Sequence, residues 1–399
     1  MYIERTTYLK ELIAWRDQKV IKVITGMRRT GKSILLGQLY RDYLLTSGVT
    51  EAQIIIVNLE SIDNEHLYHY RTLYDYINAQ LIPDKKNYVI IDEVQNADQF
   101  QKAVDSLYIK DNVDLYITGS NAQVLSSELA TLLSGRYITI ELLPLSFKEY
   151  KSSQKKEKTN AELYAEYARY GGLPYITALN NKEMQISQYL EGIYNTVLKK
   201  DIIIKRKISD VFVLEDVIKF MFDNIGNITS TNKISNTLTT HGRKVTRQTI
   251  DRYISYLIDS FILYKVNRYD IKGKEYLKSL EKYYVVDLGI RNHLLGFRNI
   301  DRGHVLENIV FLELKRRGYE IFIGKYADKE IDFIAKKADE MMYIQVAETI
   351  KDKQTFTREI TPLRMIDDYY PRLIITTDYD LNKDYDGIKV VNVYDWLLS

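Results

Sequence analysis

Residues 20–33 read Val20-Ile-Lys-Val-Ile-Thr-Gly26-Met-Arg-Arg-Thr-Gly-Lys-Ser33 and decide the fold of the first part of the chain. Gly26 to Ser33 matches the phosphate-binding pattern GxxxxGKS, and the β-branched run before it predicts a strand. A strand that delivers this loop to a helix N-terminus lets successive backbone N–H groups surround a phosphate. We therefore predict a nucleotide site that opens a helix from Ser33 to Tyr43.

The loop also supplies side chains for the nucleotide. Lys32 would bridge the β- and γ-phosphates of ATP, and Ser33 would place its hydroxyl on Mg²⁺. Arg28 and Arg29 are candidates to contact a phosphate or an adjacent subunit. The remaining residues expected to line the nucleotide are Gly26, Met27, Thr30 and Gly31.

Composition limits the classes of protein. At 399 residues the chain is too long for one ordinary core, and we expect about two to four domains. The net charge of +2 means that any nucleic-acid function must depend on a local basic patch. Without cysteines, disulfides, thiolate zinc sites and cysteine nucleophiles are excluded. The charged N-terminal segment lacks an apolar signal core, so we expect a soluble cytoplasmic protein without a membrane partner.

The rest of the first third alternates between short apolar strands and helices, with helices expected over 67–81 and 97–107. The expected strands are Gln53–Leu59, Tyr88–Glu93, Asp114–Thr118 and Tyr137–Glu141. This alternation predicts an α/β fold, a parallel sheet of the P-loop NTPase type that is covered on both faces.

Changes in composition and rhythm suggest four segments. The polar stretch 151–160 closes a P-loop core at residues 1–150. Residues 151–204 are expected to form a helical lid or linker. Residues 205–297 follow the order of a winged helix-turn-helix, with three helices before two strands at 263–269 and 283–287. Residues 298–399 are expected to form a mixed α/β domain.

An acidic pair ends the apolar stretch Val89-Ile-Ile-Asp92-Glu93. In a parallel sheet the C-terminal ends of the strands face the ligand. Asp92 would hold Mg²⁺, directly or through water, and Glu93 would polarise the attacking water. Such a base separates an ATP hydrolase from a passive nucleotide sensor.

Two further polar positions complete the predicted ATPase site. The next strand ends Thr118-Gly-Ser120-Asn121, and Ser120 or Asn121 is the candidate sensor of the γ-phosphate or of the water; a simple strand-ending turn is the alternative. Transition-state charge calls for an arginine, from the same chain or from a neighbouring subunit, and Arg136 is the first candidate.

Together, the motifs resemble the bacterial and archaeal AAA-type ATPases, in particular the archaeal STAND-like ATPases. The resemblance extends over essentially the whole chain. It implies ATP binding and hydrolysis with Mg²⁺, followed by a winged helix and a restriction-endonuclease-like domain of uncertain function. The motifs are Gly26 to Ser33, Asp92-Glu-Val-Gln95, Thr118 to Asn121, Ser134-Gly-Arg136, Pro144-Leu-Ser-Phe147, Tyr170-Gly-Gly-Leu-Pro174, Leu306-Glu-Asn308 and Glu330-Ile-Asp-Phe333.

The third helix of the predicted winged helix has an apolar face and a polar face. Its apolar side chains are Ile250, Ile254, Leu257 and Phe261. Basic residues off that face would reach DNA phosphates and base edges, and packing against protein is the alternative. The candidate DNA-binding residues are Arg243, Lys244, Arg247 and Arg252.

The last segment resembles the PD-(D/E)xK nucleases, which gather a helical Glu, a strand Asp and a D/E-x-K pair around Mg²⁺. Glu307, Asp332 and Gln345 take the first three positions, but Ala347 stands where the lysine is needed. Lys325, which could project into the site from a neighbouring position, is an alternative lysine. We expect a degenerate nuclease site that is kept for binding or assembly.

Three functions are consistent with these features. The leading hypothesis is an Mg²⁺-dependent ATPase whose nucleotide state controls the following domains and, through them, double-stranded DNA or a protein partner. The second is an ATP-controlled binding switch with little turnover, and the third is an ATP-regulated nuclease. A homo-oligomer is also considered, because the arginine can come from a neighbouring subunit.

Overall fold

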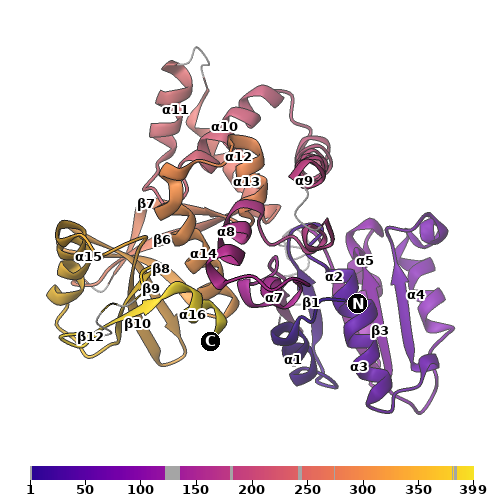
Figure 1. Ribbon diagram of the computed structural model, residues 1–399. Coiled ribbons are helices and arrows are strands. Elements are labelled where there is room, and N and C mark those ends of the chain that lie inside the picture. The colour runs from indigo at the N-terminus through magenta and orange to yellow at the C-terminus, as the bar shows by residue number, and fades with distance from the viewer. Residues whose placement is uncertain are drawn as a thin grey trace. The chain divides into compact units, whose positions relative to one another are not determined.

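The structure is a computed structural model (Figure 1) that describes residues 2–121, 135–179, 183–240, 245–273, 275–379, 381 and 384–399. The chain forms two compact units, Met1–Leu143 with Asp259–Phe261, and Pro144–Ile258 with Ile262–Ser399. The first unit ends just before the boundary expected at residue 150. Within the described residues, no helix is long and apolar enough to cross a membrane.

A five-stranded sheet of order β2-β3-β4-β1-β5 forms the centre of the first unit. Its strands are β1 Ile21–Thr25, β2 Ile54–Asn58, β3 Asn87–Asp92, β4 Val113–Thr118 and β5 Tyr137–Glu141. Every neighbouring pair is parallel, which confirms the predicted parallel sheet. All residues of β1, β3 and β4 are buried, because helices cover both faces of the sheet.

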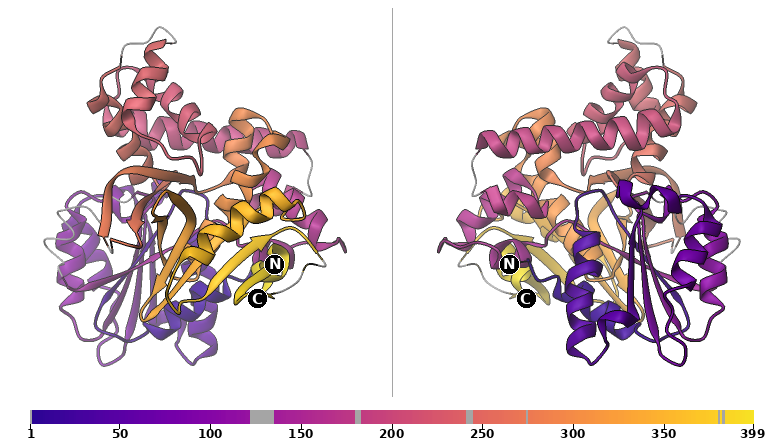
Figure 2. Two further views of the ribbon diagram at one scale, coloured as in Figure 1. Left: turned by 90° about the vertical axis from the view of Figure 1, so that its left-hand side faces the viewer. Right: turned by 90° about the vertical axis from the view of Figure 1, so that its right-hand side faces the viewer.

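The helices of the first unit lie on opposite faces of this sheet (Figure 2). On one face are α4 Tyr70–Asn78 and α5 Phe100–Tyr108. On the other are α1 Thr6–Ala14 and the helix after the P-loop. That helix consists of α2 Lys32–Ile34, a π-helical segment Leu35–Tyr40 and α3 Arg41–Thr46, where an α-helix over 33–43 was expected.

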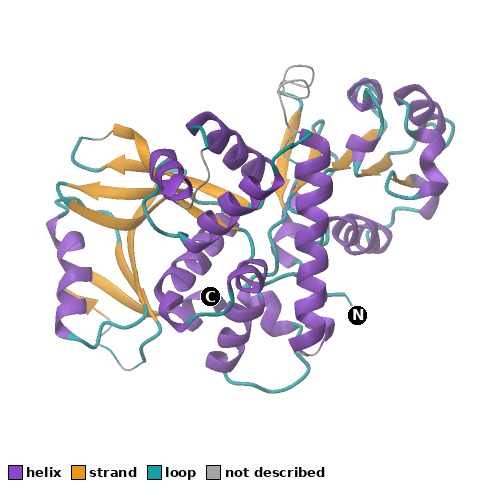
Figure 3. Cartoon of the chain, turned by 90° about the horizontal axis from the view of Figure 1, so that it is seen from above, coloured by secondary structure: helices purple, strands orange, loops and turns teal. Residues whose placement is uncertain are grey.

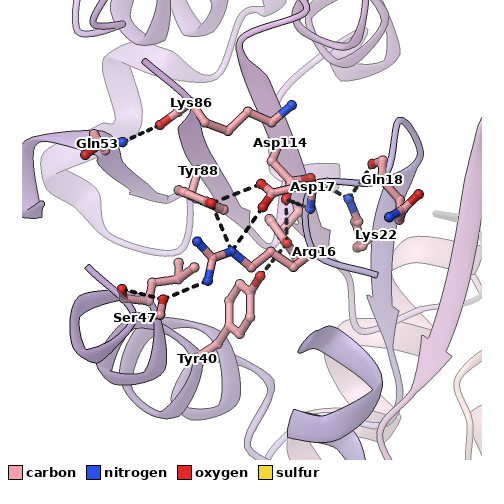
Figure 4. Close-up of polar contacts among 12 residues, drawn as sticks. Arg16, Asp17, Gln18, Lys22, Tyr40, Ser47, Gln53, Lys86, Tyr88 and Asp114 are labelled. Atoms are coloured by element: carbon pink, nitrogen blue, oxygen red, sulfur yellow. Dashed lines mark hydrogen bonds and ion pairs between the residues drawn. The ribbon is translucent and has the colours of Figure 1, made fainter. Parts of the chain in front are cut away.

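A buried polar network joins the P-loop helix to the sheet (Figure 4). Lys22 of β1 forms an ion pair with Asp114 of β4 and donates to the carbonyl oxygen of Gln18 at 2.8 Å. The Tyr116 hydroxyl donates to Asp114 at 2.8 Å and lies 2.5 Å from the hydroxyl of Tyr40 in the π-helical segment. Burial lowers the pKa of Lys22 despite the Asp114 charge.

The second unit contains most of the helices. They are α7 Phe147–Ser152, α8 Asn160–Tyr170, α9 Glu183–Thr196 with a π-helical continuation Val197–Ile204, α10 Val211–Asp223, α11 Thr231–Thr240, α12 Arg247–Asp259, α13 Leu288–Leu295, α14 Arg302–Arg316, α15 Lys353–Met365 and α16 Val393–Leu398. The three helices expected between 211 and 262 correspond to α10, α11 and α12. The sequence did not predict α13.

An eight-stranded sheet of order β12-β13-β11-β10-β9-β8-β6-β7 runs through the second unit and is drawn in orange at the left of Figure 3. Its strands are β6 Leu263–Asp270, β7 Glu275–Val285, β8 Glu320–Tyr326, β9 Lys329–Lys337, β10 Glu340–Ala347, β11 Arg372–Thr376, β12 Asp384–Tyr385 and β13 Ile388–Asn392. The strand β6 pairs with β7 and, in parallel, with β8. The two strands assigned to a wing are therefore part of the C-terminal sheet, and the boundary expected at 297/298 separates strands of one sheet.

The motif Tyr170-Gly-Gly-Leu-Pro174 packs on the N-terminus of α13. The Gly172 N–H donates to Asp287 at 2.7 Å, and Asp287 also caps α13 by accepting from the Ile290 N–H at 3.1 Å. A Cβ on Gly171, where φ is +80°, would lie 2.3 Å from the same carboxylate. Burial raises the pKa of Asp287 to about 6, although these N–H groups act in the opposite direction.

Candidate active site

The P-loop backbone requires glycine at both conserved positions of the motif pattern. Gly26 has φ +133°, and a Cβ there would lie 2.4 Å from the carbonyl oxygen of Leu142. Gly31 has φ +99° and directly precedes α2. Arg29 is also left-handed, with φ +68°. These turns let the loop curve tightly into the helix, as a phosphate-binding loop must.

Lys32 is buried at the centre of the loop. Its ammonium donates to the carbonyl oxygens of Gly26 at 3.0 Å and Met27 at 3.2 Å, and lies 3.8 Å from the Glu93 carboxylate. Met27 and Thr30 are buried, and the Thr30 hydroxyl donates to the Met27 carbonyl oxygen. Arg28 is half-buried and lies 3.2 Å from Glu60, whereas Arg29 is exposed. Lys32 therefore supplies the buried cation of the loop.

Asp92, the last residue of β3, is in contact with Ser33 at the start of the helix after the P-loop. The Ser33 hydroxyl donates to one oxygen of Asp92 at 2.6 Å, and the Thr118 hydroxyl donates to the other at 2.5 Å. Burial raises the pKa of Asp92, while both hydroxyl donors lower it, and the net shift is upward. A hydroxyl and a carboxylate in contact fit Mg²⁺, which prefers oxygen ligands.

Glu93 is fixed through its backbone and through its side chain. It has φ +53°, its N–H donates to the Thr118 hydroxyl at 2.9 Å, and Gln95 donates to its carboxylate at 2.5 Å. Sequence reasoning gave no role to Thr118 or Gln95. Both lie within the quoted motifs, but their roles depend on partners from the neighbouring strand and turn.

Ser120 and Asn121 are both buried where β4 leads out of the sheet. The Gly119 N–H donates to the Ile24 carbonyl oxygen at 3.1 Å, which places this turn beside the end of β1. Within the described residues, the Ser120 hydroxyl has no hydrogen-bond partner. A buried unpaired hydroxyl is costly in the ligand-free protein. The sensor role of Ser120 or Asn121 stays a prediction.

Arg136 lies at the opposite end of the sheet from the P-loop. Its carbonyl oxygen accepts from the N–H of Ile21, the first residue of β1, whereas the P-loop follows the last residue. Its guanidinium pairs with Asp105 of α5 at 2.6 Å. The structure therefore does not bring Arg136 to the P-loop of its own chain.

The predicted DNA-binding residues are described in part. Arg247 and Arg252 are exposed on α12. The opposite face of this helix is buried through Ile250, Ile254 and Leu257, as the spacing predicted. Arg243 and Lys244 lie outside the described residues.

The residues predicted for a degenerate nuclease site come together in the second unit. The Asp332 N–H donates to the Gln345 side-chain oxygen at 2.7 Å, and Glu307 of α14 and Asp332 of β9 share contacts with one lysine. That lysine is Lys282 of β7, which the sequence did not indicate. Lys325 instead pairs with Asp270 at 3.5 Å.

Comparisons with known proteins agree with the geometry of the first unit. A family model described as an AAA domain matches residues 18–151, and a domain of unknown function, DUF8612, matches residues 161–301. The chain is 42% identical over 401 residues to an uncharacterized protein of Haemophilus influenzae, covering 100% of this chain and 99% of that protein. An uncharacterized protein of Methanocaldococcus jannaschii is 31% identical, covering 95% of this chain and 88% of that protein.

A solved structure shows a similar fold. A Walker-type ATPase of Pyrococcus abyssi superimposes with a TM-score of 0.51 at 14% identity, covering 73% of this chain and 96% of that chain. At this identity the likeness concerns the fold alone.

Proposed function

The chain belongs to the same family as these Haemophilus influenzae and Methanocaldococcus jannaschii relatives, and from this premise and its own AAA-domain segment we propose that it is an Mg²⁺-dependent ATPase. One set of contacts carries the proposal. Asp92 accepts hydrogen bonds from Ser33 and Thr118, and Thr118 also accepts from the Glu93 N–H. The Glu93 carboxylate lies 3.8 Å from the Lys32 ammonium. A nucleotide-binding protein without turnover needs the loop but not a fixed carboxylate such as Glu93.

Each residue has a defined task in this proposal. Lys32 would exchange its contacts with the loop carbonyls for phosphate oxygens, and Ser33 and Asp92 would hold Mg²⁺. When bound, Mg²⁺ neutralises charge on the phosphates. Glu93 orients a water molecule and accepts its proton, and Thr118 keeps the Asp92 and Glu93 positions fixed relative to each other.

Replacement of Lys32 tests the assignment of the loop. Lys32→Met should weaken ATP binding at least about 100-fold, because it removes a buried charge that contacts the phosphates (about 2.8 kcal/mol). Lys10→Met, which changes an exposed lysine of α1, is the matched control and should bind ATP like the wild type. Isothermal titration with ATP and Mg²⁺ measures both. Equal affinities of the two variants would contradict the assignment.

We propose further that the nucleotide state controls a macromolecular partner of the second unit. DNA is the favoured partner because Arg247 and Arg252 are exposed on α12, although Asp251 lies between them. This switch could operate with slow turnover, which is the second candidate function.

Salt dependence distinguishes DNA from protein partners. Duplex DNA affinity should fall steeply as salt rises, and Arg247→Ala together with Arg252→Ala should reduce the slope by about 2, because each phosphate contact releases counterions. Fluorescence anisotropy with and without ATP measures this. Binding that does not change with salt, or that is undetectable, would favour a protein partner.

A further inference from the structure

A buried ammonium lies inside the carboxylate cluster of the second unit. Lys282 of β7 has a side chain that is only 4% exposed. Its Nζ lies 2.7 Å from Glu330, 3.0 Å from Glu307 and 3.7 Å from Asp332. One cation thus faces three carboxylates, which come from α14 and β9.

The oxygens around the ammonium also have hydrogen-bond donors. The Tyr284 hydroxyl donates to Glu307 at 2.6 Å, and the Val346 N–H donates to Asp332 at 2.8 Å. The side-chain oxygen of Gln345 accepts from the Asp332 N–H, which fixes Gln345 beside Asp332.

The charges are distributed unevenly within the cluster. Burial raises and Lys282 lowers the pKa of Glu307, and the net shift is downward. Burial and the neighbouring Glu307 charge raise the pKa of Asp332 to about 8. The distances agree with these directions, because the ammonium lies closer to Glu330 and Glu307 than to Asp332.

We propose that the ammonium of Lys282 is the resident cation of this cluster and takes the place that a divalent metal ion occupies in nucleases. Mg²⁺ needs six oxygen ligands at about 2.1 Å, and it would have to displace an ammonium that already binds Glu307 and Glu330. Within the described residues, no group of three or more acidic, His or Cys side chains is already placed to hold a metal ion, so these carboxylates would have to move closer together once the ammonium is removed. The nuclease-like centre is then metal-free, and the domain serves for binding or assembly.

The proposal does not depend on the ATPase, because all residues of the cluster lie in the second unit. It is tested with the full-length, nucleotide-free protein and Mn²⁺, detected by electron paramagnetic resonance. Wild type and Asp332→Asn should give the same Mn²⁺ titration. Lys282→Met should gain one Mn²⁺ ion per chain, and the double variant Lys282→Met/Asp332→Asn should lose it again.

Lys265→Met is the matched control, since Lys265 of the adjacent β6 pairs with Glu281 and is 40% exposed. It should gain no Mn²⁺. If Lys282→Met folds poorly, its Tm should rise with Mn²⁺, whereas the Tm of the double variant should not. A wild-type Mn²⁺ site that Asp332→Asn removes, or a Lys282→Met variant to which Mn²⁺ neither binds nor restores stability, would overturn the proposal.

Discussion

The hydroxyl of Thr118 connects the two carboxylates of the proposed ATPase site. It donates to Asp92 and accepts from the Glu93 N–H. Glu93 is left-handed, a conformation that costs a non-glycine residue roughly 1–2 kcal/mol, so it persists only where neighbours hold it. Thr118 and Gln95 are the neighbours that do so.

Loss of this hydroxyl should slow turnover more than it weakens binding. In Thr118→Val the buried Glu93 N–H loses its acceptor, at a cost of about 1–3 kcal/mol. If this free energy is added to the activation barrier of hydrolysis, kcat drops about 10- to 100-fold. The affinity for ATP should then change little. Steady-state turnover and titration with ATP measure the two quantities. Thr118→Ser restores the hydroxyl and should recover most of kcat; a fully active Thr118→Val would remove Thr118 from the mechanism.

Among the secondary-structure elements, the sequence predicts best those strands whose residues are both mainly apolar and buried. The strands β1, β3 and β4 are buried throughout and consist mainly of apolar residues, and their bounds were expected to within one or two residues. The strand β7 begins at Glu275, well before the expected Tyr283. The sequence did not predict this first part of the strand because its charged residues are typical of a loop. Lys282 shows why: its charge is buried only because partners from α14 and β9 surround it, and no spacing along the chain shows that arrangement.

The ion pair between Lys22 and Asp114 joins two elements that the sequence did place correctly. Lys22→Met should destabilise the first unit by about 3–5 kcal/mol, because the Asp114 charge stays buried without its partner. The double variant Lys22→Met/Asp114→Leu should recover much of this loss. Denaturant unfolding of the four proteins in the cycle measures the coupling. Additive effects of the two substitutions would show that the pair does not act as a unit.

At the scale of the whole molecule, the chain consists of a nucleotide-binding unit and a larger second unit. Within the second unit, α13 links distant segments: Asp287 binds the Gly172 N–H, and Arg291 donates to the Phe222 carbonyl oxygen and pairs with Asp301. The attachment of α13 to these segments therefore depends on the buried polar side chains of Asp287 and Arg291.

The Asp287 carboxyl should make the stability of the second unit depend on pH. Its pKa of about 6 in the fold lies above the ordinary value of 3.8, so its contribution is fully present below pH 3.8 and is lost as pH rises through about 6. The loss approaches about 3 kcal/mol, since each pKa unit corresponds to about 1.4 kcal/mol. Asp287→Asn cannot ionise and should flatten this part of the Tm profile between pH 4.5 and 7.5. Parallel profiles for both proteins would contradict the assignment.

The most direct test of the ATPase proposal is the fate of ATP on the Glu93→Gln variant. Glutamine keeps the size of the side chain but cannot accept a proton from water. After incubation with radiolabelled ATP and Mg²⁺ and rapid removal of free nucleotide, the variant should retain about one unhydrolysed ATP per chain, whereas the wild type should release ADP and phosphate. A Glu93→Gln variant that hydrolyses ATP at the wild-type rate would contradict the proposal.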